Sequence, residues 1–358
     1  MRKICFIISD ISKCGGTERV CLTIANELCR RGYNIHILSL LYKGLPFFAF
    51  DKRITFHTLL KNAIEKKFVY KRWYKKYKIK YILHKIRADI VIDTTLSDLV
   101  AKSVTGISIR YMLWVNFSYD FAISYKPHSD AINFIKDKDC TLITLTNKDK
   151  ELYIQRGMRS DNVHCISNPI TFDIPPYAAR NSKTILSVGR FSYEKGFDLL
   201  LKAWSRIEKE CPDWTLELWG DDGTSDGSIH QLKDELKLKH VQINGRTNNI
   251  NDIFANAGIY VLPSRSEGFG LVLIEAASMS LPLIAFDCPN GPKEIIANNW
   301  DGILVEANDI EKMANAILKL IQNPNMRIEM GNNAHTMSYR YNTKAIGDIW
   351  DKLLMQEK

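Results

Sequence analysis

Short runs of aliphatic and β-branched residues alternate with segments of helical periodicity along most of this 358-residue chain. The first run, KICFIIS, is typical of a strand. The segment after it places Val20, Ile24 and Leu28 on one face of a helix that stops at Gly32. Strands that alternate with helices build parallel sheets with helices on both faces. The order of the elements therefore predicts the α/β class.

The alternation occurs twice. In the first half we expect strands at NIHILSLL, ADIVID, IRYMLWV and TLITLT, and after Ile170 at KTILSVG, TLELWG, HVQING, GIYVLP and PLIAF. A chain of 358 residues is long enough for two separate cores. We therefore predict two doubly wound, Rossmann-like domains that face each other across a cleft.

The domain boundaries follow from the break between the two runs. The turn-rich stretch TFDIPPYAARNSK has no helical period and is expected to be the linker. We assign residues 1–168 to the N-terminal domain and residues 169–340 to the C-terminal domain. The last segment, 341–358, is expected to be a helix that packs back towards the N-terminal domain.

The composition excludes several classes of protein. The chain is 46% hydrophobic and 25% charged, as in ordinary globular proteins, and no apolar run is long enough to span a bilayer. The apolar run at the N-terminus stops at Ile8, which predicts a first strand rather than a signal peptide. Eight cysteines without a C-x-x-C pair suggest reduced thiols in the cytoplasm. No histidine or cysteine cluster has zinc spacing, so we expect no metal.

One segment carries the whole positive charge of the chain. Lys61–Arg87 holds eleven Lys or Arg and one Glu, a net charge of +10, and the complete chain has +9, so the other 331 residues sum to −1. Six aromatic residues interleave this segment. Basic side chains attract anionic lipid and interleaved aromatics favour the headgroup zone. We therefore expect residues 61–87 to lie on an anionic membrane surface.

Other interpretations of the basic segment are weaker. It could be a solvated basic helix, and its charge would fit nucleic acid, but no other feature indicates nucleic acid, so we expect none as a partner. Phe68, Tyr74, Ile82 and Ile86 can share a stripe at near-helical spacing, with lysines beside it. That stripe is the face expected to touch the lipid.

The stretch SRSEGFGLVLIEA (264–276) is a glycine-rich turn between an apolar strand and an apolar helix. The backbone N–H groups at such a helix start can bind an anionic or hydroxyl-rich ligand. Two carboxylates, Glu267 and Glu275, frame the turn. They fit this place if they hold the uncharged, hydroxyl-bearing parts of the same ligand.

Two further strand ends carry candidate phosphate-binding residues. Arg190 and Lys195 follow KTILSVG and could hold a diphosphate, or they could be two solvated surface cations. Gly15 and Gly16 follow the first strand and would let the backbone approach a phosphate, or they form an ordinary turn. The pattern is not G-x-G-x-x-G, so a nicotinamide site is not supported.

Two more loops follow strands of the second run. LWGDDG (218–223) could shape a nucleotide pocket, but a simple tight turn is the preferred interpretation. FDCPNGPKEII (286–296) is either a stiff connection or a second ligand loop on the same side as the Glu267 turn. All these glycine-rich turns fall at the carboxyl ends of strands, where doubly wound sheets bind ligands.

These motifs together resemble a known family. Glu267-x7-Glu275 within EGFGLVLIE, VGR and EKG upstream, and GGTER near the N-terminus are similar to the retaining glycosyltransferases of the GT-B fold, family 4. The resemblance covers nearly the whole chain in the expected order. The CPNGPKEII loop and the overall length look like bacterial enzymes that build lipopolysaccharide, O-antigen or capsule.

The resemblance implies roles for the phosphate side of the site. Gly15 and Gly16 would lie against the donor diphosphate. Arg190 and Lys195 would neutralise it and stabilise the departing nucleoside diphosphate, a role that suits positioned cations.

The resemblance also implies roles for the sugar side. Glu267 would lie by the donor sugar ring, with the amides of Phe269 and Gly270 near its hydroxyls. Glu275 would accept hydrogen bonds from the ribose hydroxyls.

One position departs from the family. Its members often have a histidine after the strand that here reads RYMLWV, and this chain has Asn116 there. An amide can donate to or accept from a sugar hydroxyl, but it cannot be a cation.

The resemblance implies a glycosyltransferase that moves a hexose or N-acetylhexosamine from a nucleotide-sugar, UDP-linked, to a lipid-linked or lipopolysaccharide oligosaccharide. It would act in the cytoplasm, peripheral on the inner face of the cytoplasmic membrane, with the nucleotide-sugar as substrate and no cofactor. Two alternatives stay open: a non-catalytic sugar-nucleotide or polyanion-binding protein, and a GT-B epimerase that acts on a UDP-sugar.

Overall fold

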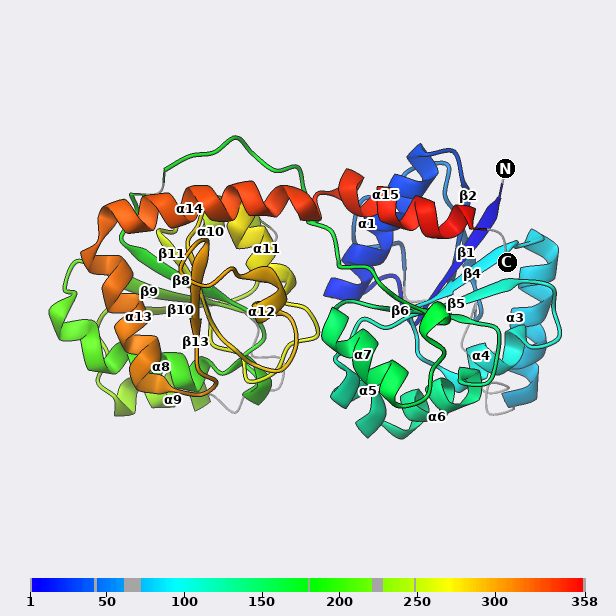
Figure 1. The fold of residues 1–358 in the computed structure, drawn as a ribbon, viewed down its shortest axis with the longest axis horizontal. Helices are drawn as coiled ribbons and strands as arrows, with labels where there is room; N and C mark the ends of the chain where they lie inside the picture. Colours follow the sequence, from blue (N-terminus) through cyan, green and yellow to red (C-terminus); the bar gives the residue numbers. More distant parts are fainter. Residues whose placement is uncertain are drawn as a thin grey trace. The chain divides into compact units, whose positions relative to one another are not determined.

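The chain forms two compact units in the computed structural model, which describes residues 2–41, 44–60, 72–179, 181–220, 228–247 and 249–356. Unit 1 consists of Met1–Thr171 and Thr343–Lys358, and unit 2 is Phe172–Asn342. Each unit contains a parallel sheet with helices on both faces (Figure 1). The predicted α/β class with two doubly wound domains is confirmed.

Unit 1 is built on a seven-stranded parallel sheet in the order β3-β2-β1-β4-β5-β6-β7. Its strands are β1 Lys3–Ile8, β2 Asn34–Ser39, β3 Thr55–Thr58, β4 Ile90–Asp93, β5 Arg110–Trp114, β6 Thr141–Thr144 and β7 Val163–Cys165. Its α-helices are α1 Gly16–Arg30, α3 Arg72–Ile86, α4 Asp98–Val104, α5 Tyr119–Ser124, α6 Lys126–Ile135, α7 Asn147–Gln155 and α15 Thr343–Met355.

Unit 2 is built on a six-stranded parallel sheet in the order β10-β9-β8-β11-β12-β13. Its strands are β8 Thr184–Val188, β9 Thr215–Trp219, β10 Val241–Asn244, β11 Ile259–Leu262, β12 Leu283–Phe286 and β13 Gly302–Val305. Its α-helices are α8 Phe197–Ile207, α9 Ser228–Glu235, α10 Ile250–Ala255, α11 Leu271–Ser278, α12 Pro292–Ile295, α13 Ile310–Gln322 and α14 Pro324–Ser338.

Each sheet has one point where the chain reverses the direction in which it adds strands. In unit 1, β1 pairs with both β2 and β4. In unit 2, β8 pairs with both β9 and β11, with Ile185 opposite Ile259 and Leu186 opposite Tyr260. In doubly wound sheets the ligand binds outside the carboxyl ends of the strands at such a switch point. The fold therefore predicts ligand-binding sites at the loops after β1, β4, β8 and β11.

The strands expected from apolar runs are present, and the three that sequence reasoning missed are all edge strands. β3 and β7 form the two edges of the first sheet and β13 forms one edge of the second. β3 reads TFHT with no fully buried residue, and β7 has only three residues. An edge strand needs less apolar sequence because one side is unpaired, so its pattern is weak.

Helix α3 shows how the basic segment folds where it is described. Ile79, Leu83 and Ile86 are buried in the core of unit 1, and Ile82 packs against that core. The prediction that Ile82 and Ile86 face lipid is therefore wrong, because both pack in or against the core. Phe68, which belongs to the same predicted stripe, lies outside the described residues. Trp73, Tyr77 and Tyr81 instead form the outer face, with exposed fractions of 65%, 64% and 56%. Within the described residues, no helix is both long and apolar enough to cross a bilayer.

The last helix, α15, belongs to unit 1. Trp350 is fully buried and its ring lies edge-on to Trp114 with 4.8 Å between centroids. Asp351 accepts a 2.6 Å hydrogen bond from the Tyr33 hydroxyl, and Arg31 bridges Asp348 at 2.7 Å. An aromatic pair of this geometry adds about 0.5–1.5 kcal/mol beyond the burial of its area. The C-terminal helix therefore helps to hold the first sheet together.

Replacing Trp350 by alanine should destabilise unit 1 by about 3–5 kcal/mol, because it leaves a large cavity against Trp114. Ile349→Ala on the same helix is the matched control, since Ile349 is 45% exposed. Calorimetry of the full chain should show a lower melting temperature for unit 1 in the Trp350 variant. The control should keep the melting temperatures of both units. Equal melting of the two variants would contradict the packing described for α15.

Candidate active site

The loops after β8 and β11 lie side by side at the switch point of unit 2. The loop after β8 ends at Gly196, which has φ +66°, and a Cβ atom there would be 2.0 Å from the carbonyl oxygen of Pro263. Only glycine allows this approach, because any other side chain would collide with rigid backbone. The contact brings two loops together that are far apart in sequence.

An ion pair joins these two loops. Lys195 Nζ is 2.6 Å from Glu267 Oε1, and the same oxygen accepts a 2.6 Å hydrogen bond from Ser264 Oγ. Glu267 is 8% exposed and Ser264 is 1% exposed. A carboxylate in this setting is held in one orientation by two donors. The structure thus brings two of the predicted site residues together and adds Ser264, which the sequence did not single out.

Arg265 fastens the same two loops from the other side. Its guanidinium donates two 2.7 Å hydrogen bonds to the carboxylate of Asp198 and one to the carbonyl of Tyr193, and it lies 4.1 Å from the centroid of the Tyr193 ring. Its backbone N–H donates to Glu194 at 2.8 Å. Burial alone would raise the pKa of Asp198, but the hydrogen bonds from Arg265 hold it below its usual value. We call Arg265 and Asp198 the loop clamp.

Arg190 begins the loop after β8 and is exposed. Together with Lys195 it contributes to a lowered pKa of Glu194, whose main cause is a hydrogen bond from Ser192. The two predicted cations thus act on one short loop, although no contact joins Arg190 to Glu267 as Lys195 does.

The start of α11 holds the other predicted residues of this unit. Gly270 caps the helix with φ +95°, and Phe269 is buried edge-on to Tyr341 at 5.6 Å. Glu275 is fully buried in the second turn of α11, and its charge, with that of Glu267, helps to raise the pKa of Tyr260, which burial already raises. The E-x7-E spacing therefore places both carboxylates inside the unit, near Tyr260.

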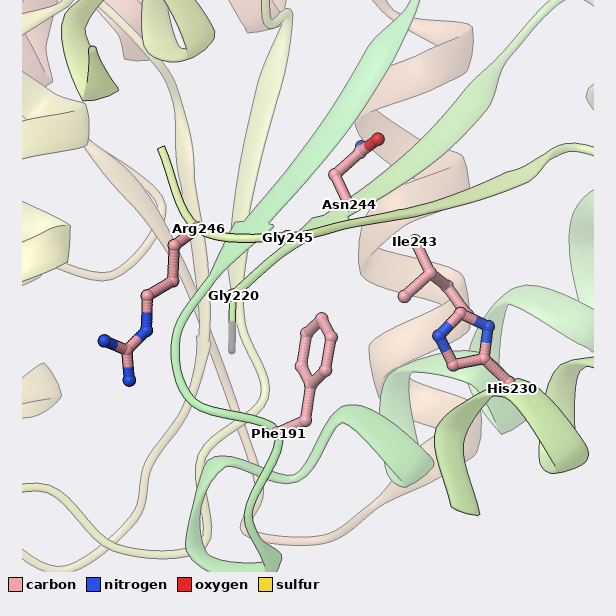
Figure 2. A pocket seen from close by; sticks show the side chains of 7 residues that line it. All are labelled: Phe191, Gly220, His230, Ile243, Asn244, Gly245 and Arg246. Atoms are coloured by element: carbon pink, nitrogen blue, oxygen red, sulfur yellow. The ribbon is translucent and has the colours of Figure 1, made fainter. Parts of the chain in front are cut away.

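A cavity of about 320 Å³ opens beside these loops (Figure 2). It is lined by Phe191, Gly220, His230, Ile243, Asn244, Gly245 and Arg246. The lining comes from the carboxyl ends of β8, β9 and β10 and from α9, and Nδ2 of Asn244 is buried without a hydrogen-bond partner among the described residues. The LWGDDG stretch is predicted from the sequence to be a simple turn, and its Gly220 lies in the wall of this cavity. Asp221, Asp222 and Gly223 lie outside the described residues. The NGR sequence at the end of β10 was missed because a short polar strand end carries no distinctive signal.

In unit 1, Gly15 caps α1 and meets a carboxylate. A Cβ atom on Gly15 would lie 2.4 Å from Glu18 Oε2, whereas nothing approaches Gly16 within 4 Å. Glu18 is 8% exposed, and burial raises its pKa. Glu18 is another residue that sequence reasoning missed, although the GGTER motif contains it.

Asn116 follows β5, also at the carboxyl edge of the first sheet. Its Nδ2 donates to the carbonyl of Trp114 at 3.3 Å, and its buried Oδ1 has no hydrogen-bond partner among the described residues. The side chain therefore offers an acceptor rather than a charge. In the part of the chain that the structure describes, no group of three or more His, Cys, Asp or Glu side chains could hold a metal ion.

The fold is that of a GT-B glycosyltransferase, and the comparisons agree. HepE of Anabaena, solved in complex with UDP and glucose, superposes with a TM-score of 0.82 at 19% identity over 100% of both chains. Residues 171–337 match the family described as glycosyl transferases group 1.

Two relatives extend the match to the whole chain. A glycosyltransferase of Haemophilus influenzae, described as uncharacterized, is 32% identical over 99% of this chain and 100% of its own. An α-1,4-N-acetyl-D-galactosaminyltransferase of Campylobacter jejuni, whose acceptor is named as a saccharide on PP-undecaprenol, is 24% identical over 100% of this chain and 99% of its own. The chain belongs to the group 1 glycosyltransferases and is an enzyme of that class.

The loop clamp generates a test of how the site is held. Arg265→Met and Asp198→Asn should each destabilise unit 2 by about 1–3 kcal/mol, because each leaves a charged partner in a partly buried place. The double variant should lose clearly less than the sum of the two, since the residues interact directly. Denaturant unfolding of the full chain measures all three. The exposed pair Lys183 and Asp213 is the control, and Lys183→Ala should stay within about 0.5 kcal/mol of the parent. If the changes in the free energy of unfolding at positions 198 and 265 add strictly, the two side chains do not stabilise each other.

Proposed function

We propose that this enzyme is a retaining glycosyltransferase that moves a hexose or N-acetylhexosamine from a UDP-linked donor to a lipid-linked or lipopolysaccharide oligosaccharide during cell-surface polysaccharide biosynthesis. The observation that carries the proposal is the pair of Lys195 and Glu267, 2.6 Å apart at the switch point of unit 2. Lys195 is a cation that can bind phosphate, and Glu267 is a carboxylate that can bind sugar hydroxyls. A nucleotide-sugar has both a phosphate and a sugar, so it needs both kinds of group close together.

The donor would bind along the carboxyl edge of the second sheet. Its nucleobase would enter the cavity that is lined by the Phe191 ring, His230 and Ile243 (Figure 2). Glu275 would receive the ribose hydroxyls, and Arg190 and Lys195 the diphosphate. Lys195 would then exchange part of its contact with Glu267 for a phosphate oxygen, which frees the carboxylate for the sugar.

The transfer would proceed with charge moving onto the diphosphate. The bond between the sugar C1 and the phosphate oxygen breaks, its electron pair stays on the diphosphate, and the acceptor hydroxyl adds to C1 on the same face while its proton passes to a phosphate oxygen. Arg190 and Lys195 would stabilise the charge on the leaving group. Glu267, with the amides of Phe269 and Gly270, would orient the sugar ring.

Residues of unit 1 also have proposed roles, which come from the family resemblance. Gly15 and Gly16 would lie against the diphosphate, and Asn116 would accept a hydrogen bond from a sugar hydroxyl through Oδ1. Glu18 lies against Gly15, and burial raises the pKa of its carboxyl above the usual value.

Two alternatives lack comparable support. A non-catalytic binding protein would not need the charged set at the switch point, and family membership argues for an enzyme. A UDP-sugar epimerase would convert its substrate without an acceptor, so incubation with UDP-sugar alone separates it from a transferase. An NMR spectrum of the new linkage would show whether the donor's anomeric configuration is retained.

Arg190→Ala and Lys195→Ala should each lower turnover on the order of 10²-fold, because each removes a cation from the leaving diphosphate. Glu267→Gln should abolish transfer with the fold intact. Arg206→Ala, an exposed arginine on α8, serves as the control. Near-normal turnover in both cation variants would refute the assignment, and unfolding of the Glu267 variant would mark that carboxylate as structural.

The same proposal places the enzyme on the inner face of the cytoplasmic membrane through residues 61–87. Trp73, Tyr77 and Tyr81 lie four residues apart on the exposed side of α3, among its lysines. Such aromatics suit the headgroup region, and each basic residue near anionic lipid contributes about 1 kcal/mol. The inner face of α3 packs in the core, so only this outer face is available to lipid.

Flotation of the full chain should show binding to vesicles with phosphatidylglycerol, weak binding to pure phosphatidylcholine, and release as salt rises, since the Debye length is only about 8 Å at 0.15 M. Replacing Trp73, Tyr77 and Tyr81 by alanine, or Lys71, Arg72, Lys75 and Lys76 by glutamine, should weaken binding. Phe121→Ala/Tyr125→Ala, which removes two exposed aromatics elsewhere on unit 1, should not. Salt-resistant binding, or equal binding to neutral vesicles, would disprove this location.

A further inference from the structure

The loop between β12 and α12 lies against the Glu267 turn. β12 pairs with β11, so both strands end at the same edge of the sheet. Gly291 has φ +92°, and a Cβ atom there would be 2.1 Å from the carbonyl oxygen of Phe269. Burial raises the pKa of the Cys288 thiol to about 12, and the charges of Glu267 and Lys195 also act on it. Residues 288–291 are thus neighbours of the pair at the switch point.

Asn290 is the unusual residue of this loop. It is 5% exposed and has φ +69°, and neither its Nδ2 nor its Oδ1 has a hydrogen-bond partner within the described chain. Asn116, Asn168, Asn244 and Asn251 each have one such buried atom, so among the residues that the structure describes only Asn290 has a buried side-chain amide with both ends unpaired. A buried polar group without a partner costs about 1–3 kcal/mol.

The backbone does not explain why an asparagine stands there. The left-handed conformation suits glycine at least as well, because glycine has no Cβ atom to clash. Glycine would also remove the unpaired amide. The amide is therefore a requirement separate from the turn, and a buried donor and acceptor in the loop that meets Phe269 through Gly291 are suited to a ligand that offers the reverse pair.

We propose that the side-chain amide of Asn290 recognises a polar substituent of the donor sugar by two hydrogen bonds, with Nδ2 donating to it and Oδ1 accepting from it. This inference rests on the proposed function, because it places the sugar beside Glu267. Two substituents have the matching chemistry: a ring hydroxyl and an acetamido group, whose N–H donates and whose carbonyl accepts. Either would pair both ends of the amide when the sugar arrives, and a sugar that lacks the group would leave them unpaired.

Asn290→Gly is the decisive variant, because it keeps the backbone conformation and removes only the amide. Calorimetric titration of the full-length protein would compare UDP, UDP-glucose, UDP-galactose, UDP-N-acetylglucosamine and UDP-N-acetylgalactosamine. The variant should bind UDP within about twofold of the parent and lose about tenfold or more, which is about 1.4 kcal/mol, towards the preferred UDP-sugar. Loss confined to the N-acetylated donors identifies an acetamido group; loss among the unmodified hexoses identifies a hydroxyl.

Asn299→Gly is the matched control, because Asn299 is an exposed asparagine of unit 2 with φ +64°. It should bind all five nucleotides as the parent does. Equal weakening of UDP and UDP-sugars by Asn290→Gly, or no weakening of either, would overturn the inference: the first outcome indicates that Asn290 shapes the nucleotide site, the second that it binds only water. If the parent protein binds none of the five, the proposed UDP-linked donor fails as well, which separates the two failures.

Discussion

The parallel pairing of β8 with β11 is the constraint on which the candidate site depends. The chain leaves β8 in one direction to form β9 and β10, and returns to place β11 on the other side of β8. Two loops that start 70 or more residues apart are therefore adjacent, and Gly196 allows them to touch at Pro263. A single sheet contact thus assembles a cation and a carboxylate that neither loop supplies alone.

Once the loops meet, their charges are organised as pairs. Glu267 is held by Lys195 and Ser264, and Asp198 is held by Arg265. Pairing lowers the cost of keeping these groups in a partly buried edge, since an isolated buried charge would be strongly unfavourable. The clamp consists of residues that face each other through two hydrogen bonds, whereas Lys195 reaches Glu267 through one.

Unit 1 uses its basic helix in two ways. The inner side of α3 completes a core with Ile79, Leu83 and Ile86, and the outer side exposes three aromatic residues among lysines. The periodicity of the segment does not separate these sides, because aromatic and aliphatic residues occur around the whole helix. Only the position of α3 on the sheet decides which of them meet the core and which meet the surroundings.

The sequence alone predicts the α/β class, most strands, the two-domain organisation and the residues at the strand ends, because these depend on the local apolar period and on turn residues that act over short distances. It did not reveal the edge strands β3, β7 and β13, whose patterns are weak because one side is unpaired. It also did not reveal Ser264, the clamp of Arg265 with Asp198, the cavity beside Phe191, or the unpaired amide of Asn290. Those features exist only when the tertiary structure brings loops from different strands together. Hydrogen bonds and burial depend on distances in space. The order of strands in the sheet sets the distance between two such side chains, whereas their separation along the chain does not.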